Sequence, residues 1–214
     1  MDSDNNPCSV SGVFFDFGGV IAEEGFRGGL KAIAEKHGKK PGDFFETAVK
    51  LIKETGYLTG ETDETSFWRT LRFETGVQDT DRSMRGEILL RFIVRDWMIA
   101  TVDALKMAGL ATGILSDQTN WLDELDEKSG FMQHFDVVIN SYHFGKSKYD
   151  GSIFDDASHA MGLSRPNVLF IDDTKQHVER ADARGLKTIH FTYKGPDEFL
   201  SALKEFCPNL EVSK

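Results

Sequence analysis

The sequence has few of the features that mark secreted or membrane proteins. Its only cysteines, Cys8 and Cys207, lie near opposite ends of a chain of 214 residues, whereas a disulfide framework uses more cysteines at closer spacing. We therefore expect two free thiols in a reducing compartment. No apolar run approaches the ~20 residues of a membrane-spanning helix, and residues 1–10 are polar and acidic rather than signal-like. The sequence predicts a cytoplasmic protein that does not contact a membrane.

Basic residues are also in short supply. The chain has 25 Lys and Arg against 35 Asp and Glu, a net charge of −10, and no basic run, which argues against nucleic acid as a partner. A phosphorylated substrate stays compatible with this charge, because a metal ion or one well-placed lysine can invert the local field. The hydrophobic content of 40 % and the 17 phenylalanines suffice for a packed core. The length fits one domain, or one domain carrying a smaller inserted one.

Short apolar runs and helical patterns alternate along most of the chain. The expected strands are residues 13–17, 111–115, 137–140, 168–171 and 187–190. The expected helices between the later strands are residues 119–129, 149–161 and 174–184, each followed at once by a glycine suited to a helix C-terminus. Strand–helix alternation of this kind predicts a doubly wound parallel α/β sheet with right-handed crossovers and the first strand at its centre.

The gap of about ninety residues between the first two strands is longer than one crossover needs. Helical patterns fill it at residues 30–37, 43–54, 63–74 and 81–107. We expect a helical cap domain at residues 22–95 inserted into an α/β core made of residues 12–21 and 96–207, with flexible tails at residues 1–11 and 208–214. Because the insertion begins just after the first strand, it should overhang the carboxyl edge of the sheet.

Asp16 is an unusual charge in its context. It ends an apolar run and is followed by Gly18 and Gly19 after one phenylalanine. In open α/β sheets the ligand lies beyond the carboxyl ends of the strands. A carboxylate at this place is therefore a nucleophile, a metal ligand or both.

The later strand ends carry further polar groups. Ser116 and Asp117 end the second strand ahead of a helix, where exposed amides and the helix dipole favour phosphate. Lys148 follows the third strand. Asp172 and Asp173 end the fourth strand, and two adjacent buried carboxylates repel one another unless a cation lies beside them. Oxygen ligands of this type suit Mg²⁺.

With these four motifs in this order, the chain resembles the haloacid dehalogenase-like hydrolase superfamily, in the branch with a helical cap between the first and second motifs. The resemblance runs from about Val13 to Phe191. The Asp-x-Gly-Gly-Val form of the first motif, at residues 16–20, is most similar to sugar-phosphatase-like members and to the phosphatase domain of soluble epoxide hydrolase.

The resemblance implies a role for each motif residue. Asp16 would be the nucleophile that takes the phosphoryl group as an aspartyl-phosphate. Ser116 would donate a hydrogen bond to the phosphate, and Lys148 would neutralise it and hold Asp16 in place. The resemblance also implies a Mg²⁺ site made of Asp16, Asp172, Asp173 and the backbone carbonyl of Gly18. The aspartate pair can instead split into one direct ligand, Asp173, and one residue that caps the next helix.

The sequence departs from the family pattern at Gly18, at Asp117 and at residues 148–150, where Lys-Tyr-Asp replaces the common Lys-Pro and is expected to change loop geometry rather than chemistry. Gly18 stands where phosphatases of this type carry an Asp as general acid, a function worth about 10²–10⁴-fold in rate. A nearby residue can replace it, and the candidates are Glu23, Glu24 and His143; alternatively, the substrate has a good leaving group or the domain turns over weakly. Asp117 stands where Asn is more usual, so either only its backbone N–H is used or its carboxylate faces the site.

Several other residues carry no clear functional signal. His134, His159, His177 and His190 sit in ordinary helix or strand contexts and are interpreted as structural. Phe26 and Arg27 follow the first motif, where contact with substrate and a plain surface or core role fit equally well.

The sequence thus predicts a Mg²⁺-dependent phosphatase for a small phosphorylated metabolite, either a sugar phosphate or a nucleotide. The rival enzyme is a 2-haloacid dehalogenase, which uses the same nucleophile without metal and would leave the pair at residues 172–173 without a cation. A third hypothesis, motivated by Gly18, is a phosphate-binding or regulatory domain with little turnover.

Overall fold

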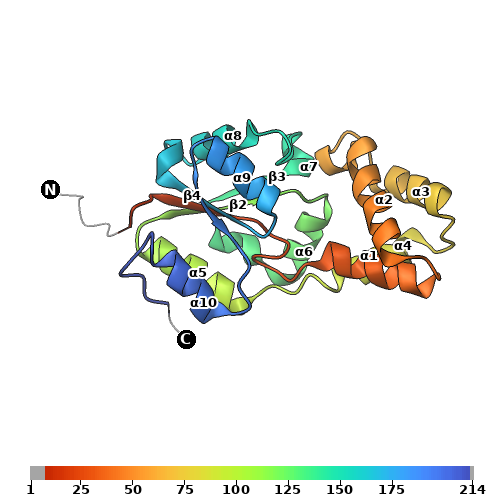
Figure 1. Ribbon diagram of the computed structural model, residues 1–214, viewed down its shortest axis with the longest axis horizontal. Coiled ribbons are helices and arrows are strands. Elements are labelled where there is room, and N and C mark those ends of the chain that lie inside the picture. Colours follow the sequence, from red (N-terminus) through yellow and green to blue (C-terminus); the bar gives the residue numbers. More distant parts are fainter. Residues whose placement is uncertain (1–7, 213–214) are drawn as a thin grey trace.

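The computed structural model describes residues 8–212, and its centre is a five-stranded parallel sheet (Figure 1). The strands are β1 (Gly12–Phe15), β2 (Ala111–Ser116), β3 (Val137–Asn140), β4 (Val168–Asp172) and β5 (Lys187–His190). Their order in the sheet is β3-β2-β1-β4-β5, so β1 is central and pairs with both β2 and β4. The predicted doubly wound α/β fold is confirmed, and every expected strand forms within about two residues of its predicted bounds.

Helices cover both faces of the sheet because both faces of the strands are apolar (Figure 1). One face carries α5 (Asp96–Met107), α6 (Trp121–Ser129) and α10 (Pro196–Leu203), and the other carries α8 (Ile153–Ala160) and α9 (Lys175–Ala183). Three short helical turns complete the core, namely η2 (Phe131–His134), α7 (Ser141–Phe144) and η3 (Arg165–Asn167). The glycines predicted to end α6, α8 and α9 all adopt positive φ, between 67° and 87°.

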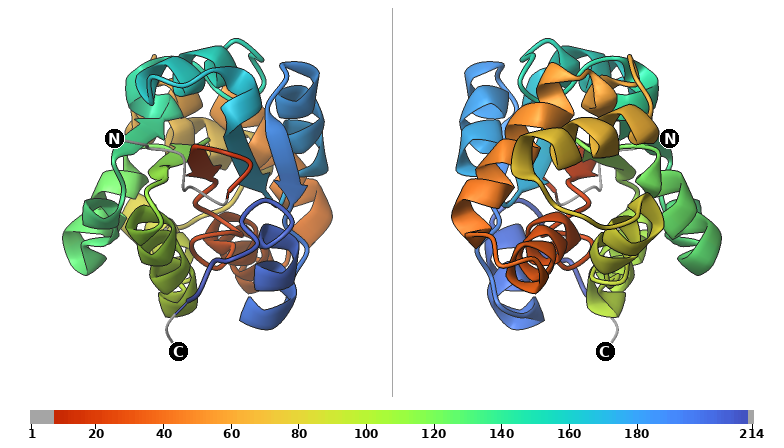
Figure 2. Two further views of the ribbon diagram at one scale, coloured as in Figure 1. Left: turned by 90° about the vertical axis from the view of Figure 1, so that its left-hand side faces the viewer. Right: turned by 90° about the vertical axis from the view of Figure 1, so that its right-hand side faces the viewer.

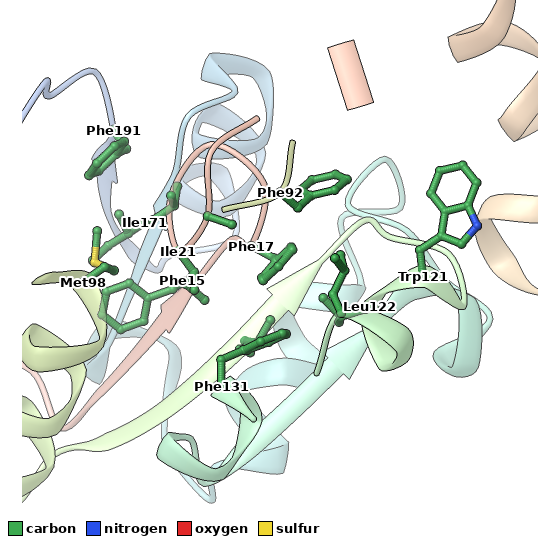
Figure 3. Packing of buried hydrophobic residues seen from close by; sticks show 14 of the residues in the cluster. Phe15, Phe17, Ile21, Phe92, Met98, Trp121, Leu122, Phe131, Ile171 and Phe191 are labelled. Atoms are coloured by element: carbon green, nitrogen blue, oxygen red, sulfur yellow. The ribbon is translucent and has the colours of Figure 1, made fainter. Parts of the chain in front are cut away.

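Aromatic packing extends the core toward the carboxyl edge of β1. Phe15 and Phe17 lie in the larger apolar cluster (Figure 3), whereas Phe14 belongs to the second cluster. Phe17 stacks on Phe131 with ring centroids 4.8 Å apart, and its ring lies 5.6 Å from that of Phe92. The segment that follows β1 is therefore fixed by buried rings on both sides of Asp16.

The remaining helices, called the distal helices below, lie together beyond the carboxyl ends of the strands, to one side of the sheet (Figures 1 and 2). They are α1 (Gly25–Lys36), α2 (Pro41–Glu54), η1 (Tyr57–Thr59), α3 (Glu64–Thr75) and α4 (Asp81–Leu89). Helix α1 packs against both α2 and α4. Glu24, Asp63 and Thr80 accept a hydrogen bond from the first turn of α1, α3 and α4 respectively.

The predicted helix over residues 81–107 is wrong as a single element. Helix α4 ends at Leu89 and α5 begins at Asp96. The intervening segment pairs with the chain leaving β1: the Glu23 amide donates to Ile93 O and the Arg95 amide to Ile21 O, both at 2.9 Å. The two connections between the distal helices and the sheet therefore run side by side, and this pairing interrupts the helix.

The two cysteines form a disulfide, so the prediction of two free thiols is wrong. Cys8 and Cys207 are 199 positions apart in sequence, yet their Cα atoms are 4.1 Å apart. The fold brings them together because the chain entering β1 runs beside the end of α10, where the Ser9 amide donates to Phe206 O at 2.7 Å. Sequence spacing carries no trace of this proximity.

One residue in the described part of each predicted tail packs against the core. Val10 and Leu210 are both buried. Flexible tails at residues 1–11 and 208–214 stay a prediction, of which residues 1–7 and 213–214 lie outside the described residues. Within residues 8–212, the helices are too short or too polar to cross a membrane.

Candidate active site

Three carboxylates meet at the carboxyl edge of the sheet. Asp16 directly follows β1, and Asp172 and Asp173 lie at the end of β4, which is paired with β1. One oxygen from each residue lies within 4.8 Å of those of the other two. Asp16 is 8 % exposed and Asp172 is fully buried. The sequence argument that parallel strands deliver these residues to one place therefore matches the geometry.

Lys148 is the cation at the centre of this group. Its side chain is fully buried, and its Nζ lies 2.8 Å from Asp16 Oδ1 and 2.6 Å from Asp172 Oδ2. The Lys148 amide donates to Asp117 Oδ1 at 2.7 Å, which fixes the loop that carries the lysine. The Asp117 carboxylate thus lines the site and positions Lys148, while its Oδ2 is buried without a partner among the described residues.

The pKa values of these four groups are shifted because the site is largely buried and holds more negative than positive charge. Burial raises the pKa of Asp16 well above its usual range, although Lys148 opposes the shift. Burial also acts on Asp172, but Lys148 and His177 outweigh it and lower the pKa to about 2. Burial and then the charge of Asp172 raise the pKa of Asp173. Burial alone would lower the pKa of Lys148, yet the surrounding carboxylates raise it, so the lysine is charged.

This donor set fits Mg²⁺, which prefers carboxylate and carbonyl oxygens. The oxygens of Asp172 are already engaged, because Oδ1 accepts from the Thr174 amide at 2.7 Å and Oδ2 accepts from Lys148. The Asp173 carboxylate has only a 3.2 Å contact with the Thr174 hydroxyl among the described residues, which leaves it with more free acceptor capacity. The geometry therefore favours Asp16 and Asp173 for direct contact with a cation, and Asp172 for orienting the lysine.

The two glycines after Asp16 are constrained in different ways. Gly19 has a φ of 85°, and a Cβ there would lie 2.2 Å from Asp173 Oδ2. Gly18 is limited by a neighbour instead, because a Cβ would lie 3.3 Å from the ring of Phe92. A side chain at position 18, where the family pattern carries an acid, would thus begin in tight contact with Phe92.

A pocket of about 210 Å³ opens over these groups. Asp16, Ser116 and Lys148 line its floor, and residues of α1, α2 and η1 line the opposite side. Ser116 is 2 % exposed and lies at the end of β2, as the phosphate-binding prediction requires. A larger cavity of about 510 Å³ between α4 and α6 contains none of the three carboxylates.

Only one of the three candidates for the missing acid lines this pocket. Glu23 pairs with Arg95 at 3.0 Å, and His143 pairs with Asp123 at 2.6 Å; neither is among the lining residues. Glu24 does line the pocket, and burial raises the pKa of its carboxyl. One of its oxygens accepts from the Arg27 amide at 2.8 Å, which leaves the other for a ligand.

Sequence reasoning did not single out His177 as a residue of the site. It is 7 % exposed, lines the pocket, and its Nδ1 lies 3.2 Å from Asp172 Oδ2. Its Nε2 is buried without a partner among the described residues. Its spacing could have indicated its place in the site. His177 is four positions after Asp173, so in a helix that follows the strand it lies one turn from the strand end.

The sheet, the acidic group with its buried lysine and the overlying helices define a doubly wound α/β enzyme with its site at the carboxyl edge of the strands. The chain matches the haloacid dehalogenase-like hydrolase family over residues 10–181. This protein belongs to that family, and the resemblance inferred from its motifs is confirmed.

Relatives of known name are similar over most or part of the chain. The GMP/IMP nucleotidase YrfG of Escherichia coli K12 is 24 % identical over 182 residues, or 83 % of this chain and 81 % of that protein. The bifunctional epoxide hydrolase 2 of Mus musculus is 29 % identical over 99 residues, or 43 % of this chain and 18 % of that one. A HAD family enzyme of Bacteroides thetaiotaomicron, solved with magnesium and inorganic phosphate, superposes with a TM-score of 0.70 at 17 % identity, covering 89 % of this chain and 98 % of that one.

Proposed function

We propose that this chain is a Mg²⁺-dependent phosphatase that hydrolyses a small phosphomonoester through an aspartyl-phosphate on Asp16. The observation that carries the proposal is the meeting of Asp16, Asp172 and Asp173 around the buried Lys148. Three carboxylates and one ammonium leave excess negative charge, which a divalent cation offsets. The nucleotidase relative and the phosphate-bound neighbour lend support to a phosphorylated substrate.

The residues of the site have distinct parts in this reaction. Asp16, Asp173 and the Gly18 carbonyl would hold Mg²⁺, which when bound neutralises charge on the phosphate oxygens. An oxygen of Asp16 attacks phosphorus, and the bond to the leaving oxygen breaks as that oxygen takes a proton from Glu24 or from water. Water then attacks the phosphorus of the aspartyl-phosphate, releasing inorganic phosphate and restoring Asp16.

Ser116 and Lys148 act on the transferring group without changing covalently. The Ser116 hydroxyl donates a hydrogen bond to a phosphate oxygen at the end of β2. The Lys148 ammonium screens the repulsion between the Asp16 carboxylate and the phosphate dianion, which otherwise prevents the attack. Asp117 and Asp172 keep the lysine in place through its backbone and its side chain.

We propose that residues 22–95 form a cap that closes over the pocket, with residues 12–21 and 96–207 as the core. Both ends of this segment lie at one place, where Ala22 pairs with Val94. A cap that excludes bulk water favours small substrates.

The first test is hydrolysis of p-nitrophenyl phosphate with Mg²⁺, with EDTA, and by the Asp16→Asn variant. This ester has a good leaving group and hardly needs a general acid, so Gly18 does not limit it. We expect turnover that requires Mg²⁺ and is abolished in Asp16→Asn but retained in Asp43→Asn, a control on the outer surface of α2. Wild-type turnover no higher than that of Asp16→Asn would contradict the phosphatase.

Two alternatives have their own signatures in the same experiment. The first is a domain that binds phosphate without turnover, motivated by the absence of an acid at Gly18, and calorimetry with inorganic phosphate and Mg²⁺ would then detect binding alone. A haloacid dehalogenase would release chloride from 2-chloropropionate with or without EDTA. Metal-dependent phosphate release with no chloride release separates the proposal from both.

We propose that this protein is located in the cytoplasm. The disulfide is an observation against this location, because the cytoplasm is a reducing compartment. Thiol trapping of Cys8 and Cys207 in lysed, fractionated cells tests it. Alkylation of both thiols in the cytosolic fraction supports the cytoplasm, and a protected pair in another fraction contradicts it.

A further inference from the structure

Two cations line the pocket on the side that faces away from the sheet. Arg27 comes from the first turn of α1 and Lys53 from the last turn of α2. The other residues that α1, α2 and η1 contribute to this side are apolar, namely Phe26, Phe45, Val49, Ile52 and Leu58. The pocket therefore has an acidic end at the sheet and a basic, otherwise apolar end under the distal helices.

Neither cation has an ion pair with a carboxylate among residues 8–212 in a chain of net charge −10. Each lies instead over an aromatic ring: Arg27 Cζ is 3.9 Å from the centroid of Phe45, and Lys53 Nζ is 3.6 Å from that of Tyr149. Lys50 on the same helix shows the contrast, because it lies outside the pocket and pairs with Glu54 at 3.8 Å. The charges at the pocket are thus positioned over rings without a direct ion pair, and Glu24 is the pocket carboxyl that Arg27 acts on electrostatically.

A ring face holds a cation in place without using its N–H donors, at a gain of roughly 0.5–1 kcal/mol at an exposed site. The donors of Arg27 and Lys53 are therefore available to an anion that enters the pocket. Tyr149 directly follows Lys148 in sequence, so the ring under Lys53 belongs to the same loop as the buried lysine of the site. This contact places a cation of α2 beside the loop that carries Lys148, the lysine proposed to screen the charge of the reacting phosphate.

We propose that the substrate is a phosphomonoester with a second anionic group, a carboxylate or a second phosphate, and that Arg27 and Lys53 bind this group. The proposal rests on the proposed function and names the substrate class of the same site. The pocket volume of about 210 Å³ lies below the roughly 300–1,000 Å³ typical of drug-sized ligands, which suits a small acid. An uncharged sugar would leave both cations unused and would find few hydrogen-bond partners on the apolar wall.

The experiment compares matched esters that differ in the second charge. The carboxylate arm uses 2-phosphoglycolate against ethyl phosphate, and the phosphate arm uses propane-1,3-diol bisphosphate against its monophosphate. We expect kcat/KM of the wild type to be roughly three- to tenfold higher for one charged ester than for its neutral partner, because Arg27 and Lys53 are both exposed and each exposed charge pair contributes only modestly. Raising the salt to 0.5 M should reduce this ratio.

Variants at the two cations test where the preference arises. Arg27→Gln and Lys53→Gln should each lower the ratio of charged to neutral kcat/KM several-fold, mainly through KM, and Arg27→Lys should retain part of it. Lys50→Gln is the control and should leave the ratio and the turnover unchanged. Equal rates for charged and neutral esters, a higher rate with GMP or IMP than with either charged ester, or an unchanged ratio in both glutamine variants would each overturn the proposal.

Binding to the Asp16→Asn variant keeps this test separate from that of the proposed function. Calorimetry with Mg²⁺ should show tighter binding of the preferred charged ester than of its neutral partner, and Lys53→Gln in the same background should reduce the difference. If turnover of p-nitrophenyl phosphate is present and this selectivity is absent, the phosphatase stands and the substrate class is wrong. If turnover is absent and the selectivity is present, the substrate class stands and hydrolysis is wrong.

Discussion

Replacing Lys148 with Met should expose how strongly the site depends on one buried charge. Met keeps an unbranched, apolar stem but removes the ammonium that contacts Asp16 at 2.8 Å and Asp172 at 2.6 Å. Removing one partner of a buried ion pair typically costs about 3–5 kcal/mol, because the remaining charge is buried without compensation. We expect a loss of this size in the free energy of unfolding at pH 7 without metal.

The pH dependence of this loss has a defined sign. In the wild type the pKa of Asp172 is about 2, below its ordinary value of 3.8, so the stability it contributes is present above pH 3.8 and is lost as the pH falls through 2. Without Lys148, burial raises the pKa of this carboxyl, so the folded variant binds more protons than the unfolded chain. Its stability therefore falls as the pH rises, and the gap to the wild type should be wider at pH 7 than at pH 4.5.

Urea unfolding followed by tryptophan fluorescence measures both effects. Lys146→Met is the matched control, because Lys146 lies two positions earlier, is half-exposed and pairs with Asp156 at 2.6 Å. Exposed pairs of this kind contribute about 0–1 kcal/mol. The reasoning is refuted if Lys148→Met and Lys146→Met unfold within 1 kcal/mol of each other at pH 7, or if the gap narrows as the pH rises.

Three further perturbations probe other parts of the chain. Cys207→Ser should lower the free energy of unfolding by about 5 kcal/mol in the chain-entropy model, since the bridge closes a loop of 199 positions; urea unfolding measures it, and a loss below 1 kcal/mol contradicts it. Gly19→Ala should lower Mg²⁺-dependent turnover at least roughly tenfold, since its Cβ meets the site, whereas Gly109→Ala, with a φ of 86° and open space, should retain turnover. Asp79→Asn should lower the free energy of unfolding by roughly 1 kcal/mol at pH 7. Lys36 holds the pKa of Asp79 below 3.8, so the free energies of unfolding of variant and wild type should converge as the pH falls. Urea unfolding curves that diverge in acid would refute this.

The sheet could be predicted from the sequence because parallel strands are recognised as short apolar runs followed by helical patterns and glycines. The positions of Asp16, Ser116 and Asp172 followed from the same signal, since the carboxyl ends of parallel strands share one edge. The partners of these residues did not follow. Nothing in the spacing of Asp117 indicates that its carboxylate holds the Lys148 amide, because that contact joins two loops 31 positions apart.

The errors have a common physical origin in contacts between distant segments. The helix break between α4 and α5 arises from pairing with residues about seventy positions earlier in the chain, and local helix propensity cannot register it. The disulfide arises in the same way from the packing of the chain's two ends. His177 was read as structural because helix context alone does not show which polar group its ring faces.

The paired connections at the base of the distal helices also bear on how the chain folds. Gly12 pairs with Ala111, so the central β1–β2 contact closes a loop of roughly 100 residues. Once Ala22 has met Val94, the loop left to close is roughly 30 residues long, and its entropic cost falls by about 1 kcal/mol. We therefore expect the junction of Ala22 and Val94 to shorten the loop that the β1–β2 pairing has to close, so that refolding slows when this junction is weakened.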